Sequence, residues 1–149
     1  MALEADGEPV VRMQKYAILA TTILLLSAQT SAAAEPLALK GYDPVAYFAE
    51  GKPSPGKEQY QASFDYVRYW FASPQHRDLF AGDPERYAPQ FAGSCTMGMA
   101  IGKKVEADPE AWLIRDEKLY VFFSPQAREN FQQDPGRYLT EAERNWAAH

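Results

Sequence analysis

The sequence predicts an α+β fold in which two tandem strand–turn–strand–helix repeats pack as one pseudo-two-fold domain. The main evidence is an internal repeat: residues 69–87 (YWFASPQHRDLFAGDPERY) align without a gap with residues 120–138 (YVFFSPQARENFQQDPGRY), at an offset of 51 positions. Of the 19 aligned pairs, 11 are identical. A fixed period of this size indicates a repeated supersecondary unit. The two copies fall at about 42–89 and 93–140.

Each copy is too small to be stable alone, because a unit of about 50 residues buries too little apolar surface. We therefore expect the copies to share one core and one sheet, with side-by-side units and no shared sheet as the alternative. Aromatic residues make up 13% of the chain, and each removes roughly 150–250 Å² from water when buried.

The strands are predicted from aromatic and β-branched runs that flank short polar turns. The first copy predicts strands at 60–64 and 68–72 around a turn near Asp65. The second predicts strands at 112–114 and 118–123 around Asp116-Glu117.

A helix follows the second strand of each copy. Ser73 and Ser124 are predicted N-caps, each followed by a proline suited to the first helical turn. The helices should end before Asp83-Pro84 and Asp134-Pro135, because a residue before proline disfavours the helical region. Each aspartate should then cap a further helical turn. Phe80 and Phe131 should face the sheet.

Residues 1–34 are typical of a secretory signal peptide, and the pattern favours Met13 as the true start. Lys15 precedes an apolar run of roughly 13 residues that ends in Ala32-Ala33-Ala34. That run is shorter than the ~20 residues of a membrane-spanning helix. The sequence thus predicts a periplasmic or secreted protein, with an uncleaved membrane anchor as the alternative.

The predicted mature chain, 35–149, is acidic. It has 13 Lys and Arg against 17 Asp and Glu, a net charge of 13 − 17 = −4. No basic run occurs, so nucleic-acid binding lacks its electrostatic signature. CxxC and HExxH motifs and Gly-rich phosphate loops are also absent from the sequence.

The chain resembles the YHS domain family. The motifs that carry the resemblance are GYDPVAYF (41–48), residues 69–95, GKKVEADPEAW (102–112) and KLY (118–120). The small exported members of the family are the most similar. This resemblance implies a treble-clef-like fold and suggests metal handling. Cysteines of metal-type members are replaced here by Ala46, Ala72 and His76, which excludes a four-cysteine zinc knuckle.

Positions where the copies differ are the candidates for function. At an offset of 51 the most telling differences are Pro44 against Cys95 and His76 against Ala127. In contrast, Tyr42 and Asp43 are interpreted as structural residues of the YDPV motif, with a role in a site as the alternative.

The most specific candidate metal site consists of Cys95, Met97 and Met99. A thiolate and two thioethers suit a soft metal such as copper(I), and alternate side chains of an extended segment would share a face. His76 is the fourth candidate ligand, whereas His149 is expected to lie in a disordered end. Core packing by the sulfur residues and a reactive Cys95 thiol remain open.

The function predicted from the sequence is an exported, non-enzymatic YHS domain protein that binds a soft metal such as copper. The alternative is a metal-free interaction module with an exported or membrane protein partner. A cysteine-dependent enzyme that pairs Cys95 with His76 is a third hypothesis. With one cysteine in the sequence, the protein would be a monomer or a Cys95-linked dimer.

Overall fold

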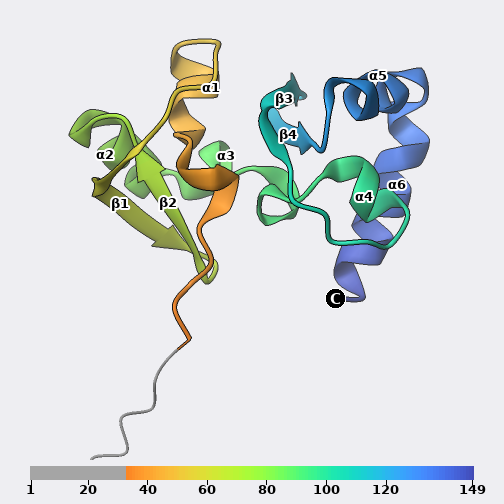
Figure 1. The fold of residues 1–149 in the computed structure, drawn as a ribbon, viewed down its shortest axis with the longest axis horizontal. Helices are drawn as coiled ribbons and strands as arrows, with labels where there is room; N and C mark the ends of the chain where they lie inside the picture. The colour runs from red at the N-terminus through yellow and green to blue at the C-terminus, as the bar shows by residue number, and fades with distance from the viewer. Residues whose placement is uncertain (1–32) are drawn as a thin grey trace, which may run out of the picture. The chain divides into compact units, whose positions relative to one another are not determined.

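The computed structural model describes residues 33–149, so the predicted signal peptide lies almost wholly outside the described part. The described chain is α+β, with two antiparallel hairpins and α-helices α1–α6 (Figure 1). The elements are, in order, η1 (Ala38–Gly41), α1 (Pro44–Ala49), β1 (Lys57–Phe64), β2 (Val67–Phe71), α2 (Pro74–Gly82), α3 (Pro84–Tyr87), η2 (Gln90–Gly93), α4 (Thr96–Ala100), β3 (Asp108–Arg115), β4 (Lys118–Phe122), α5 (Pro125–Gln133) and α6 (Pro135–Ala147).

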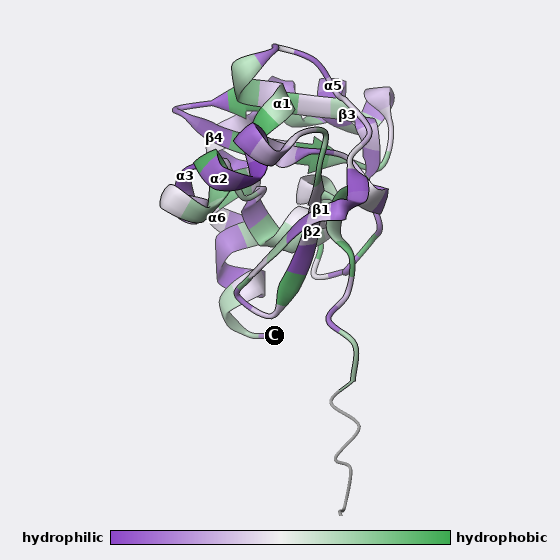
Figure 2. Ribbon diagram, turned by 90° about the vertical axis from the view of Figure 1, so that its left-hand side faces the viewer, coloured by the Kyte–Doolittle hydropathy of each residue, from purple (hydrophilic) through white to green (hydrophobic). Residues whose placement is uncertain are grey.

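The two hairpins form separate two-stranded sheets, so the expectation of one shared sheet is wrong. Phe64 pairs with Val67 next to the first turn, and Arg115 pairs with Lys118 next to the second. Both central residues of each turn have positive φ, as a two-residue hairpin turn with the twist of its strands requires. Buried and half-buried residues alternate along β2, so the side of the strand with Val67, Tyr69 and Phe71 is buried. Hydrophobic and hydrophilic residues are interspersed along the helices and strands (Figure 2).

The predicted helices after the hairpins are confirmed. Ser73 Oγ accepts a hydrogen bond from the His76 amide, and Ser124 Oγ accepts one from the Ala127 amide. Phe80 is buried against Tyr69 and Phe71, with ring centroids 4.9 and 5.0 Å away. Phe131 makes the corresponding contacts with Tyr120 and Phe122.

The helices that follow Asp83-Pro84 and Asp134-Pro135 differ in length and in capping. Both preceding helices end where the sequence predicts, before Asp83 and Asp134. Asp134 caps α6 through the Arg137 amide, but Asp83 makes no capping bond to α3. The expectation of a cap at Asp83 is therefore wrong. After the second break α6 continues to Ala147, well beyond the single turn expected, and buries Ala142.

The copies are not aligned by one fixed offset. The turns η1 and η2 and the starts of α1 and α4 are 52 residues apart, whereas every later element begins 51 residues after its counterpart. The helix α1 has six residues and α4 has five, so the extra residue lies within α1. The N-cap of α1 is Asp43 and the N-cap of α4 is Cys95. Cys95 therefore corresponds to Asp43, and the gapless pairing with Pro44 is wrong.

A left-handed turn precedes each of these N-caps. Leu39 and Lys40 have φ of 54° and 50°, and Phe91 and Ala92 have 56° and 52°. Left-handed backbone costs roughly 1–2 kcal/mol for each such L-residue. Gly41 ends the first turn at φ +83°, where a Cβ would lie 2.7 Å from Trp70 Cε3.

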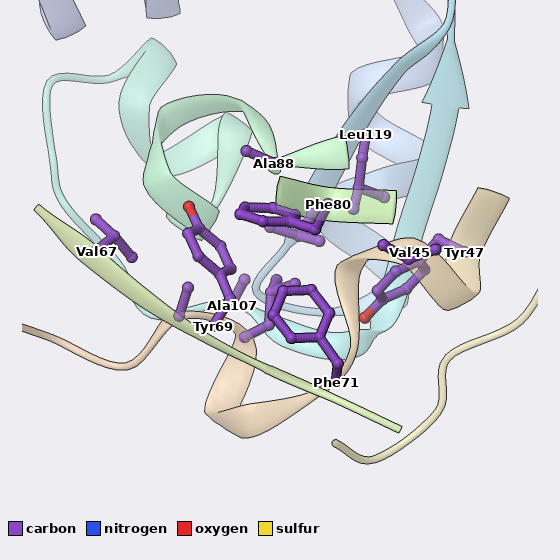
Figure 3. Packing of buried hydrophobic residues seen from close by; sticks show 12 residues of the cluster. Val45, Tyr47, Val67, Tyr69, Phe71, Phe80, Ala88, Ala107 and Leu119 are labelled. Carbon is purple, nitrogen blue, oxygen red and sulfur yellow. The ribbon is translucent and has the colours of Figure 1, made fainter. Parts of the chain in front are cut away.

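The buried residues form two clusters. The first joins both copies, because Ala107, Leu119 and Val121 pack with Val45 and other residues of the first half (Figure 3). The second is built from the second half, around Phe91 and α6. Among residues 33–149, no helix combines the length and apolar character needed to cross a membrane.

Candidate functional site: the Asp43–His76 pair

Asp43 is a fully buried carboxylate at the N-terminus of α1. Its Oδ1 accepts hydrogen bonds from the Val45 amide at 2.8 Å and the Ala46 amide at 3.3 Å. Its Oδ2 accepts one from the Ala72 amide at 2.8 Å, at the junction of β2 and α2. Burial of a carboxylate is tolerated only when its oxygens are well satisfied. Asp43 thus ties the start of α1 to the start of α2.

His76 completes this arrangement. It is the third residue of α2, and its Nδ1 lies 2.6 Å from Asp43 Oδ2. Because an ionised carboxylate only accepts hydrogen bonds, we assign the proton to His76 Nδ1. The side chain is 15% exposed. Asp43 therefore fixes the orientation of the ring and leaves Nε2 as its other polar atom.

Glu50 lies on the Nε2 side of the ring. It is the C-cap of α1, and its Oε1 lies 3.9 Å from His76 Nε2. The side chain of Glu50 is 37% exposed. A line of three polar groups thus runs from the buried Asp43 through His76 to the solvent-accessible Glu50.

The second copy lacks this pair. Cys95 occupies the N-cap position of Asp43, and Ala127 occupies the helix position of His76. Cys95 is 2% exposed, and its Sγ accepts a hydrogen bond from the Gly98 amide at 3.4 Å. Two of the differences between the copies therefore fall on residues that contact each other in the first copy.

The geometric premise of the sulfur site is wrong. The residues after Cys95 form the helix α4 and not an extended segment, so Met97 and Met99 lie about 200° apart around its axis. Met99 is fully buried in the second cluster, and Met97 packs against that cluster. Within residues 33–149, no hydrogen bond joins His76 to Cys95. Metal binding by Cys95, Met97 and Met99 stays a prediction.

The described residues also contain no group of three or more His, Cys, Asp or Glu side chains placed to hold a metal ion. A metal that binds here through protein side chains would have to rely on two donors and ligands from solution. His76 Nε2 and Glu50 Oε1, which lie 3.9 Å apart, are one such pair of donor atoms.

Two tyrosines next to the site contact the second copy. Tyr47 donates a hydrogen bond to the Pro109 carbonyl at 2.8 Å, and Tyr42 donates one to Glu110 Oε1 at 3.4 Å. Burial, followed by the charge of Glu110, raises the pKa of Tyr47 above its ordinary value. These contacts link Tyr47 of α1 and Tyr42, two residues before α1, to β3, in keeping with structural roles for the YDPV motif.

The sequence favours a structural role for Asp43, with a role in a site as the alternative, and does not pair it with His76. Its signal was available, since an aspartate before a proline is a common start of a helix. Its burial and its contact with His76 depend on how α1 packs against α2, which no local pattern reports.

Comparisons with protein-family models, curated proteins and solved structures find no match to this chain. Membership of the YHS family therefore stays a prediction.

Proposed function

We propose that this chain is an exported, non-enzymatic module of YHS type that binds a divalent transition-metal ion through His76. The observation that carries the proposal is the 2.6 Å contact between the buried Asp43 carboxylate and His76 Nδ1. Histidines that bind metals almost always donate their second ring N–H to a carboxylate, carbonyl or water. That bond fixes the tautomer and makes the free nitrogen a better ligand.

The donor set selects the class of metal. Imidazole and carboxylate suit Zn²⁺ or Cu²⁺, whereas Cu⁺ prefers thiolate and thioether ligands. Two donor atoms 3.9 Å apart need only a small side-chain movement to bind one ion, because Zn–N and Zn–O bonds are about 2.0–2.2 Å long. Solution ligands would fill the other positions. The site would therefore bind weakly and exchange its ion readily, as suits a module that passes metal on.

The second candidate function is the metal-free interaction module. It is favoured by two exposed apolar residues of the second copy, Phe123 at 63% and Ile101 at 67%. Large exposed apolar side chains mark contact sites when they form a continuous patch. Protein that takes up none of these metals would support this function in place of metal binding.

We also propose that the two copies are related by a pseudo-two-fold axis. Support comes from the order of the elements, since turn, helix, hairpin and two further helices recur at offsets of 51 or 52 residues. The first buried cluster, which contains residues of both copies, is consistent with such packing.

The metal proposal is tested by titrating the purified protein with Zn²⁺ and Cu²⁺ against a chelator of known affinity. We expect binding near one equivalent, with the affinity reduced at least tenfold in His76→Ala. His149→Ala is the matched control for a histidine at the chain end and should bind normally. Cys95→Ser should also bind normally. Loss of copper binding in Cys95→Ser but not in His76→Ala would contradict the proposal and support the sulfur site.

A further inference from the structure

A groove of about 240 Å³ lies between the turn of the first hairpin, the segment after α3 and the end of α6. Its chemistry comes from six lining residues: Phe64, Asp65, Tyr69, Glu85, Phe91 and Trp146. We call it the Asp65–Glu85 groove. It is separate from the pair at His76, so the inference goes beyond the function proposed above.

The walls of the groove are partly aromatic, and its charged side chains are all acidic. Four of the eleven lining residues are aromatic, and among the described residues no Lys, Arg or His lines the groove. Asp65 and Glu85 make no salt bridge with any of the residues from 33 to 149. A shallower hollow that shares Phe64, Asp65 and Glu85 adds the carboxylate of Glu35. The groove therefore presents two carboxylates without a salt bridge beside aromatic side chains.

Tyr69 lines this groove with an aromatic side chain that also carries a hydroxyl. The residue as a whole is only 2% exposed. Figure 3 shows the ring with its hydroxyl pointing away from Phe71. Burial, and next the charge of Asp65, raise the pKa of Tyr69 above its ordinary value. The Asp65 carboxylate and the Tyr69 ring thus both line the groove.

Trp146 already attracts an ammonium group. Lys104 Nζ lies 5.0 Å from the centroid of a ring of Trp146. Lys104 does not line the groove, and its ammonium lies within cation–π distance of the indole. Cations within about 6 Å of an aromatic face are attracted by the ring, most strongly by tryptophan.

We propose that the Asp65–Glu85 groove binds a small organic cation that carries a quaternary ammonium group. Aromatic rings hold such a group by cation–π attraction, and the carboxylates supply the opposite charge. A bare metal ion fits less well, since rings provide no ligand atoms. The volume lies below the roughly 300–1,000 Å³ of sites for drug-sized ligands, so the ligand should be small.

The test is titration of the purified chain with choline, followed by calorimetry and by the indole N–H signal of Trp146. The uncharged isostere 3,3-dimethylbutan-1-ol separates charge from shape. We expect choline to bind and shift the Trp146 signal, and the isostere to bind at least about tenfold more weakly. Equal binding of the two compounds, or no binding of choline, would overturn the proposal.

The double variant Asp65→Asn/Glu85→Gln removes both charges and should leave the fold intact. Both side chains are exposed, and asparagine tolerates the positive φ of 51° at position 65. We expect choline binding to weaken at least tenfold in this variant. Asp116→Asn is the matched control, because Asp116 holds the same turn position in the second copy and lies outside the groove. An equal loss in both variants would contradict a site in this groove.

Discussion

Asp43 and His76 lie 33 residues apart in the chain and are joined by a 2.6 Å contact between Oδ2 and Nδ1. The second copy replaces both residues, with Cys95 at one position and Ala127 at the other. The serine N-caps, the Asp-Pro pairs and the aromatic contacts recur in the second copy, which has no Asp–His pair. The pair is what distinguishes the first copy chemically.

Substitution of Asp43 should destabilise the fold strongly. Asp43→Ala removes a helix cap, worth about 0.5–2 kcal/mol, and leaves the Ala72 amide unsatisfied, at about 1–3 kcal/mol. We expect a loss of about 3 kcal/mol in the free energy of unfolding, measured by urea denaturation. Asp134→Ala, which removes an exposed cap of α6, should lose about 1 kcal/mol or less. Equal losses of unfolding free energy in the two variants would show that the buried contacts of Asp43 add nothing to stability beyond an ordinary helix cap.

Two glycines provide a contrasting pair of stability variants. A Cβ on Gly56 would lie 2.5 Å from the Trp70 carbonyl carbon and 2.7 Å from the Gly41 oxygen, so Gly56→Ala should destabilise by about 2–3 kcal/mol. Gly136 lies in α6 and a Cβ there would meet nothing within 4 Å, so Gly136→Ala should stabilise by about 0.5–1 kcal/mol. Thermal unfolding of both variants checks the two signs. A neutral Gly56→Ala would contradict the close packing around Trp70.

The buried tyrosines should make the fold sensitive to alkali. Burial is the main cause that raises the pKa of Tyr47, Tyr69 and Tyr120 above the ordinary tyrosine value of 10.0. The folded state then keeps protons that the unfolded state releases. Stability is therefore fully present below about pH 10 and falls as the pH rises further.

Each such tyrosine removes up to about 1.4 kcal/mol of stability per pH unit in that range. Urea denaturation at about pH 9, 10 and 11 measures the slope on both sides of the ordinary tyrosine pKa. Tyr47→Phe should make the slope shallower, whereas Tyr66→Phe, at an exposed turn position, should not. A slope that stays the same in Tyr47→Phe would contradict the burial of its hydroxyl.

Cys95 should be an unreactive thiol in the folded protein. It is 2% exposed, and its Sγ accepts a hydrogen bond from the Gly98 amide. Opening of the fold must precede attack by a thiol reagent, so we expect labelling by 5,5′-dithiobis(2-nitrobenzoate) at least about 100-fold slower than in denaturant. On a non-reducing gel the protein should run as a monomer. Rapid labelling under native conditions, or a reducible dimer, would restore the reactive-thiol alternative.

The local structure could be predicted from the sequence because it depends on neighbouring residues. Ser73-Pro74 and Ser124-Pro125 start helices, and the Asp-Pro pairs end them, for reasons that lie within a few positions of chain. The burial of Phe80 and Phe131 was predicted from the same repeat.

Only one residue of the Asp43–His76 pair was predicted from the sequence as a candidate site residue. His76 stood out because Ala127 replaces it, but the single extra residue in α1 shifted the alignment and paired Cys95 with Pro44. A gapless comparison cannot detect such a shift, since it changes no identity in the well-matched stretch. The helix α4 was missed because Gly98 and two flanking glycines favour a loop.

The sharpest test of metal binding at His76 is the ¹⁵N NMR signal of its ring during a Zn²⁺ titration. The signal is assigned by its loss in His76→Ala, and His149 serves as the internal reference. We expect Nε2 of His76 to shift on zinc binding while Nδ1 keeps its proton toward Asp43. A His76 ring that stays unchanged at zinc concentrations that shift His149 would contradict metal binding through His76.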